Sequence, residues 1–164
     1  MRKNYSVGFK RKRMGKTDYR KRLAILSANK PRLVVRKSLN NILAQVVEYD
    51  EKGDRVIVSS HSAELKKYSW DKNCGNIPSA YLVGLLIGSK SKKKNIKEMI
   101  LDLGSQKSIK GSRVYSLLKG CIDSGVVIPH SKEILPSGDR INGKHIKNFD
   151  TKKFEEVKTK VLGA

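Results

Sequence analysis

The sequence is poor in acidic residues. Only 15 of its 164 residues are Asp or Glu, against 36 Lys or Arg, which gives a formal net charge of +21. A chain with this imbalance repels itself in any compact state unless a polyanion neutralises part of the charge. Nucleic acid is the first candidate for such a partner, and an anionic membrane surface is the second.

Cysteine and histidine are also scarce. Cys74 and Cys121 are far apart, no CxxC pair occurs, and the three histidines share no metal-ligand spacing with them or with one another. Zinc sites are built from such residues at short, regular spacings. We therefore interpret both cysteines as small buried apolar residues, and we expect neither a metal nor any other cofactor.

Long apolar runs are missing. The most apolar stretch, residues 77–87, is too short to cross a bilayer and is typical of a core helix. The basic N-terminus is not followed by the apolar segment of a secretory signal. It also lacks the Trp- and Leu-rich face with which a membrane-surface helix enters the headgroup layer. These absences favour a cytoplasmic protein without a membrane partner.

A complete phosphate-binding motif is absent too. Residues 14–17, Met-Gly-Lys-Thr, resemble the end of a P-loop, but Lys10 stands where its first glycine belongs, and no strand is expected before it. We therefore expect no nucleotide and no other small-molecule substrate.

Positive charge is concentrated at the N-terminus. Residues 1–37 contain fourteen Lys or Arg and one acid, Asp18, whereas the remaining 127 residues share a net charge of only +8. The aromatic residues Tyr5, Phe9 and Tyr19 are interleaved with this charge. Cations pair with phosphates, and flat rings stack on unpaired bases. We interpret the segment as an arm that grips nucleic acid; the alternative is a solvated basic tail without a fixed partner.

Apolar periodicity and turn residues predict the elements of the body. Residues 1–16 lack periodicity and are expected to be disordered without a partner. The predicted helices cover 17–28, 62–68, 78–89, 112–124 and a stretch from 151, and the predicted strands cover 32–37, 42–49, 55–60, 99–103 and 126–128. Lysine-rich residues 90–97 are expected to form a loop. Gly84 and Gly88 are expected to bring their helix close to the sheet.

This order of elements predicts an α/β fold. The sheet is expected to be mixed, with an antiparallel meander, added strands and packed helices. We expect a basic arm over residues 1–16, an RNA-binding domain over 17–128, and a C-terminal extension over 129–164 with a short terminal helix.

Two groups of residues suggest specific chemistry. Lys110 and Arg113 flank the start of the helix expected at 112, where free backbone N–H groups favour phosphate; an ordinary helix start is the alternative. Asp102, Glu48 and Asp50 are carboxylates that a metal-dependent nuclease would use. A buried acid such as Asp102 is more often held by a structural ion pair, so we expect no enzyme.

Six segments, read in order, resemble the universal family of large-subunit ribosomal protein eighteen in its archaeal form. They are Gly-Lys-Thr-Asp-Tyr-Arg-Lys-Arg-Leu at 15–23, Lys-Pro-Arg-Leu-Val-Val-Arg-Lys at 30–37, Ser-His-Ser-Ala-Glu-Leu at 60–65, Asn-Ile-Pro-Ser-Ala-Tyr-Leu at 76–82, Lys-Gly-Ser-Arg-Val at 110–114 and Ile-Pro-His-Ser at 128–131. The resemblance extends over about residues 7–146. Residues from Lys147 onward match nothing in the family pattern.

The resemblance implies a structural ribosomal protein with an α/β sandwich fold. Its implied role is to bind 5S rRNA, attach it to the central protuberance of the large subunit, and contact large-subunit rRNA and neighbouring ribosomal proteins. A general RNA-binding protein is the alternative to this specific role. The residues that match the family's basic arm are Lys10, Arg11, Lys12, Arg13, Lys16, Thr17, Tyr19, Arg20 and Arg22, and those that match its first strand are Arg32, Arg36 and Lys37.

Overall fold

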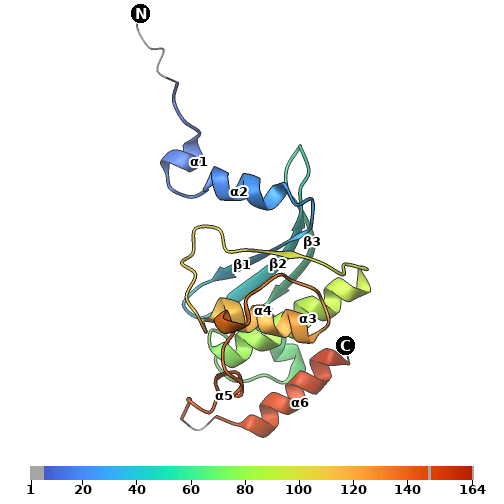
Figure 1. Cartoon of the computed structure of the whole chain (residues 1–164). Helices are drawn as coiled ribbons and strands as arrows, with labels where there is room; N and C mark the ends of the chain where they lie inside the picture. Colours follow the sequence, from blue (N-terminus) through green and yellow to red (C-terminus); the bar gives the residue numbers. More distant parts are fainter. Residues whose placement is uncertain (1–5, 148, 164) are drawn as a thin grey trace, which may run out of the picture.

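The fold is built on a mixed sheet, seen in a computed structural model that describes residues 6–147 and 149–163 (Figure 1). Its strands are β1 (Arg32–Lys37), β2 (Ile42–Glu48), β3 (Arg55–His61) and β4 (Ile100–Asp102), in the order β3-β2-β1-β4. The first three form an antiparallel meander, and β4 lies parallel to β1. The predicted α/β class and mixed sheet are confirmed.

Helices surround this sheet. They are α1 (Lys10–Arg13), α2 (Tyr19–Leu26), the 3-10 helix η1 (Ser62–Tyr68), α3 (Ile77–Lys93), α4 (Arg113–Asp123), the 3-10 helix η2 (Lys132–Ile134), α5 (Gly138–Ile141) and α6 (Thr151–Leu162). In Figure 1, α3 and α4 lie on one side of the sheet and α1 and α2 on the other. Among the described residues, no helix is both long and apolar enough to cross a membrane.

The strands alternate between a buried face and an open face. Leu33 and Val35 of β1 and Ala44 and Val46 of β2 are fully buried in the core with α3. Because successive strand residues point to opposite faces, Arg32, Val34 and Arg36 point away from this core. The side of the sheet opposite α3 is therefore lined by both charged and apolar side chains.

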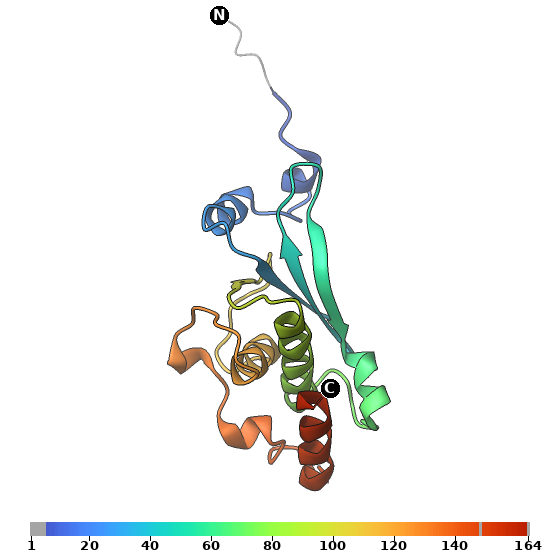
Figure 2. The same ribbon diagram turned by 90° about the vertical axis from the view of Figure 1, so that its right-hand side faces the viewer.

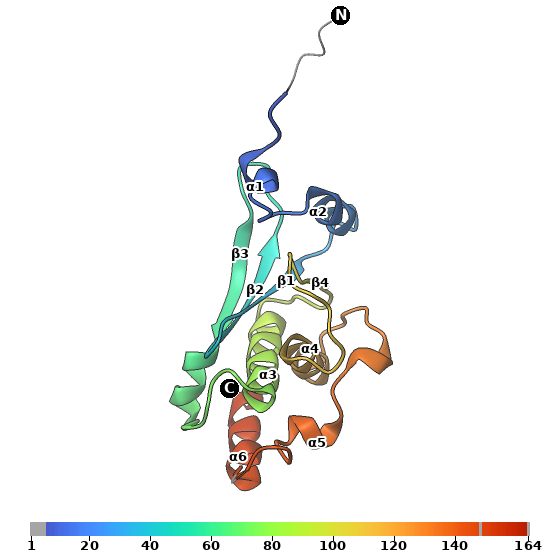
Figure 3. The same ribbon diagram turned by 90° about the vertical axis from the view of Figure 1, so that its left-hand side faces the viewer.

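Two glycines bring α3 and α4 into backbone contact. A Cβ atom on Gly84 would overlap the carbonyl oxygen of Leu117, and one on Gly120 would overlap that of Tyr81. The two views in Figures 2 and 3 show α3 and α4 packed side by side. The expectation that Gly84 and Gly88 approach the sheet is wrong, because both face α4: a Cβ on Gly88 would strike Ser124.

The C-terminal helix is anchored by aromatic side chains. The Asp150 side chain caps this helix by accepting a hydrogen bond from the Lys153 backbone N–H, and Phe154, Val157 and Val161 are buried as one stripe. The terminal helix predicted from residue 151 is confirmed. The Phe154 ring lies 6.4 Å from that of Trp70 and 6.0 Å from that of Tyr81, between ring centroids. Helix α6 thereby packs against α3 (Figures 2 and 3).

The N-terminal expectations need two corrections. Lys10–Arg13 form helix α1, so disorder over 1–16 is wrong for this stretch, whereas residues 1–5 lie outside the described part of the chain. The rings of Phe9 and Tyr19, 5.4 Å apart, close the loop that follows α1. Helix α2 begins at Tyr19 and not at residue 17, because the Asp18 carboxylate caps it by accepting hydrogen bonds from two backbone N–H groups.

Two further boundaries differ from the expectations. Helix α3 continues to Lys93, so the loop predicted for 90–97 begins only after the helix. The predicted strand at 126–128 is reduced to a single bridge between Val127 and Glu98, since Pro129 has no N–H to continue the pairing.

The glycine contact predicts the effect of one methyl group. Gly84→Ala should destabilise the fold by about 1–3 kcal/mol or more, because α3 and α4 must move apart to admit the Cβ. Gly138→Ala is the matched control, since nothing lies within 4 Å of a Cβ there. Urea unfolding followed by circular dichroism measures both. Equal stability of the two variants would contradict the close crossing.

Candidate nucleic-acid interface

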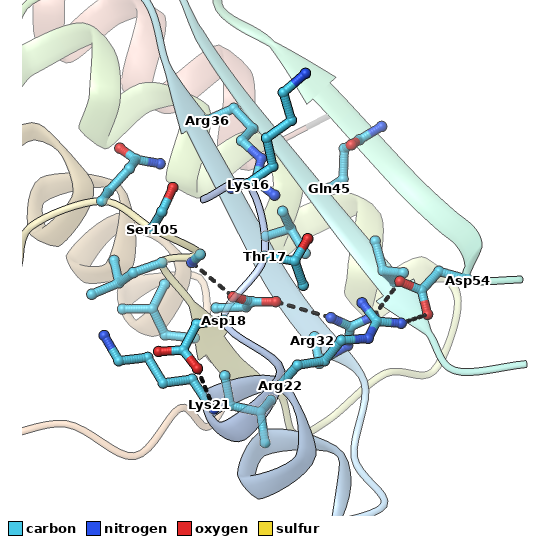
Figure 4. Close-up of a pocket in the computed structure, with 18 of the residues that line it drawn as sticks. Lys16, Thr17, Asp18, Lys21, Arg22, Arg32, Arg36, Gln45, Asp54 and Ser105 are labelled. Atoms are coloured by element: carbon cyan, nitrogen blue, oxygen red, sulfur yellow. Dashed lines mark hydrogen bonds and ion pairs between the residues drawn. The ribbon is translucent and has the colours of Figure 1, made fainter. Parts of the chain in front are cut away.

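A cleft of about 740 Å³ opens between the N-terminal segment and the open face of the sheet. Its first wall includes Lys16, Thr17 and Arg22, and its floor is formed by β1 and β2. Residues 103–108, which follow β4, form the opposite wall. Figure 4 shows these side chains converging from segments that are far apart in the sequence.

Arg32 forms the centre of the cleft floor. Although charged, it is only 2 % exposed. Its Nη1 donates a hydrogen bond to Asp102 Oδ2 at 2.9 Å, and its Nη2 lies 2.7 Å from Asp54 Oδ2 in an ion pair. A buried charge needs such partners, since an unpaired one carries a large desolvation cost.

The network continues to α2 through Asp54. Arg22 Nη2 donates to Asp54 Oδ1 at 2.8 Å, and this bond raises the pKa of Arg22. Partial burial would by itself raise the pKa of Asp54, but the hydrogen bonds and charges of Arg22 and Arg32 outweigh it and lower the pKa. No residue of α2 is buried within the described structure. The position of α2 over the sheet therefore depends on this ion pair more than on apolar packing.

The wall after β4 is held by polar contacts. Asp102 Oδ1 accepts a hydrogen bond from the Gly104 N–H at 2.8 Å, and Gly104 adopts a φ of 58° that suits glycine. The guanidinium of Arg36 lies against Gly104. Gln106 donates to the Val35 carbonyl at 2.7 Å, while its Oε1 is buried without a hydrogen-bond partner among the described residues.

Of the remaining residues predicted on the arm and α2, one lines the cleft and the others do not. Arg11 lines the cleft, and its Nε donates to Thr17 Oγ1 at 2.8 Å. The predicted contact residues on the arm and α2 that do not line the cleft are all exposed: Lys10, Lys12, Arg13, Tyr19 and Arg20.

Three predicted contact residues lie away from the cleft lining. Lys37 is exposed at the far end of β1. Lys110 forms an exposed ion pair with Glu133, at 3.6 Å. Arg113 Nη1 donates to the carbonyls of Gly75, at 2.7 Å, and Ser38, at 3.2 Å, so its guanidinium joins two loops of the protein itself.

Several lining residues were missed by the sequence interpretation. Lys21, Gln45, Asp54 and residues 103–108 all line the cleft. Lys21 belongs to the same basic cluster as Arg20 and Arg22, so charge density was a usable signal for it. The others carry no sequence signal. The pairing of β2 with β1 brings Gln45 to the cleft, the turn before β3 brings Asp54, and the pairing of β4 with β1 brings residues 103–108.

Two comparisons with known proteins show which family the chain belongs to. A family model described as ribosomal large subunit proteins 60S L5 and 50S L18 matches residues 3–99. The large ribosomal subunit protein uL18 of Methanococcus maripaludis is 50% identical over 149 residues, which cover 91% of this chain and 77% of the relative. The chain belongs to the uL18 family of large-subunit ribosomal proteins.

Membership of the uL18 family makes this a structural protein and not an enzyme. The geometry around Asp102 is consistent with that conclusion, because its carboxylate is engaged by Arg32 and by the Gly104 N–H. Within the described ranges, no group of three His, Cys, Asp or Glu side chains is placed to hold a metal ion. Membership of the family, and not this absence, sets the nuclease alternative aside.

The ion-pair network predicts a pH-dependent contribution to stability. A carboxyl with a lowered pKa stabilises the fold above its unfolded pKa, near 4, and loses this effect as the pH falls through the folded pKa. Asp54→Asn should cost about 1–2 kcal/mol at pH 7. The difference in the free energy of unfolding between the variant and the wild type should be smaller at pH 3 than at pH 7. Urea unfolding at both pH values measures it.

The control for this variant is Asp139→Asn, which removes an exposed ion pair with Lys144. It should remain within about 0.5 kcal/mol of wild type. If Asp54→Asn behaved like this control, the network would not position α2 in the way described.

Proposed function

We propose that this protein binds 5S rRNA and attaches it to the large-subunit rRNA at the central protuberance of the ribosome, in the cytoplasm. The observation that carries the proposal is the cleft between the basic N-terminal segment and the open sheet, in a chain of the uL18 family. Neighbouring large-subunit proteins are the expected further partners.

Charge and shape both support RNA as the occupant of the cleft. The side chains of Lys16, Lys21 and Arg36 line it and form no ion pair within the described residues, so their charges are available to phosphates. A-form RNA hides its base edges in a deep, narrow groove, so specificity comes from RNA shape, unstacked bases and 2′-OH groups. The exposed rings of Phe9 and Tyr19, at the starts of α1 and α2, supply stacking surfaces.

The role proposed for Arg32 differs from that of Arg36 and Lys37 on the same strand. Its guanidinium is buried and paired with Asp54 and Asp102, so we assign it to positioning the cleft walls and not to contacting RNA. Arg113, bonded to the carbonyls of two loops, receives the same kind of role. Lys110 remains a candidate phosphate contact, because it is mostly exposed.

The chain divides into three segments with different proposed roles. The arm, residues 1–16, supplies affinity and part of one cleft wall. The body, residues 17–128, supplies the rest of the cleft and the stability. The extension, residues 129–164, packs on α3 through α5 and α6. Neutralising the arm with phosphate releases counterions, which offsets the entropy lost when the arm is ordered against RNA.

Specific binding is tested by comparing RNAs. The protein should bind 5S rRNA more tightly than tRNA or duplex DNA at matched physiological salt, in a filter-binding or gel-shift assay. Equal affinity for 5S rRNA and tRNA would refute the specific function and leave a general RNA-binding protein.

Deleting residues 1–16 tests the role of the arm. The deletion removes seven cations, Arg2, Lys3, Lys10, Arg11, Lys12, Arg13 and Lys16. If about half of them meet phosphates, the slope of log K against log salt should shrink by roughly 3. The melting temperature of the free protein should stay the same or rise, because like charges are removed. An unchanged slope, or an unfolded body, would show that the chain is divided elsewhere.

A further inference from the structure

A second group of lysines lies at the end of α3. Lys92, Lys93 and Lys94 are consecutive and exposed, and Lys97 follows three residues later. In Figure 1 this end of α3, on the right, is separated from α1, on the left above the sheet. None of the four lines the cleft. The group is therefore distinct from the arm.

The backbone holds the first three lysines of this group, Lys92 to Lys94, in a fixed place. Asn95 adopts a left-handed φ of 60°, and the Ile96 N–H donates to the Ser91 carbonyl while the Asn95 N–H donates to the Lys92 carbonyl. This is the Schellman arrangement, which satisfies the last carbonyls of a helix. Ile96 packs on the core, and Ser91 is buried. An anion arriving here meets ammonium groups on a rigid turn, with fewer open carbonyl oxygens to repel it.

The acid closest in sequence to this group is engaged elsewhere. Glu98 is the closest acid in the sequence, and its Oε2 is already paired with Lys30 Nζ at 2.5 Å. Lys92, Lys94 and Lys97 form no ion pair among the described residues. The helix dipole favours lysines within the last turn, which accounts for Lys92, whose ammonium lies over Gly125 at the end of α4. It does not account for Lys97, which lies beyond the turn.

We propose that Lys92, Lys94 and Lys97 form a second phosphate-binding surface, which contacts the backbone of an RNA helix other than the RNA held by the arm. This inference rests on the proposed function and extends it, because a protein that joins two RNAs needs two separated basic surfaces. Point charges on flexible lysine stems suit the phosphate backbone and not base reading. The second surface contributes attachment, whereas the cleft contributes recognition.

The test uses the full-length protein with its arm already occupied. The protein is first saturated with 5S rRNA, and a fluorescein-labelled RNA duplex is then titrated onto the complex. For Lys92→Gln, Lys94→Gln and Lys97→Gln combined, duplex affinity should fall and its salt slope should shrink by about 2–3. Affinity for 5S rRNA should not change. The triple replacement by Arg keeps the charge and should restore duplex binding.

The matched control removes the same charge elsewhere. Lys147, Lys152 and Lys160 are exposed and lie near or on α6, and their combined change to Gln should leave both affinities as in wild type. An equal loss in this control, or an equal loss of 5S rRNA binding in the test variant, would overturn the proposal. No change in either RNA affinity would also overturn it, and would point to an acidic protein face as the partner.

The two proposals fail in different ways. If the wild-type protein did not bind 5S rRNA, the proposed function would fail at the first step. Binding of the RNA duplex by the free protein would then test the second surface. A loss of duplex affinity in the Gln variant but not in the control variant would support the second surface, and no loss would overturn it.

Discussion

The buried charge of Arg32 joins four parts of the chain. Its guanidinium, on β1, pairs with Asp102 on β4 and with Asp54 in the turn before β3, and Asp54 in turn holds Arg22 on α2. Replacing such a network by apolar residues often leaves stability unchanged, but removing one member exposes the others to a large desolvation cost. The network therefore acts mainly to fix where α2, the hairpin and the wall after β4 stand relative to one another.

The ion pairs around Arg32 determine how the basic N-terminal segment is held over the sheet. Helix α2 buries no residue within the described structure, so the basic segment is held over the sheet by directional charge contacts with little apolar packing. Below the sheet the opposite holds, because α3 and α4 meet at Gly84 and Gly120 with their backbones in contact. A rigid, close-packed body thus supports a lightly attached basic segment, which can change its position while the core stays unchanged.

Much of the fold could be predicted from local patterns. The strands from Arg32 to His61, the Asn76 cap and the α6 stripe of Phe154, Val157 and Val161 follow from period, turn residues and caps that act over a few residues. The predictions from the sequence are wrong where contacts between residues distant in the sequence determine the structure. The pair of rings at Phe9 and Tyr19 orders a segment without periodicity, and α4 takes up the glycine face of α3 that was expected to meet the sheet.

The sequence by itself determined that the protein is basic, α/β and related to a ribosomal family, because charge, periodicity and motifs are properties of the chain read in order. The tertiary structure decided which basic residues are available to a partner. Arg32 and Arg36 are four residues apart on one strand and both line the cleft, yet Arg32 is buried and paired with two carboxylates whereas Arg36 is exposed. That difference arises because β4 and the β2–β3 turn, distant in sequence, bring their acids to Arg32, and no local pattern encodes such an approach.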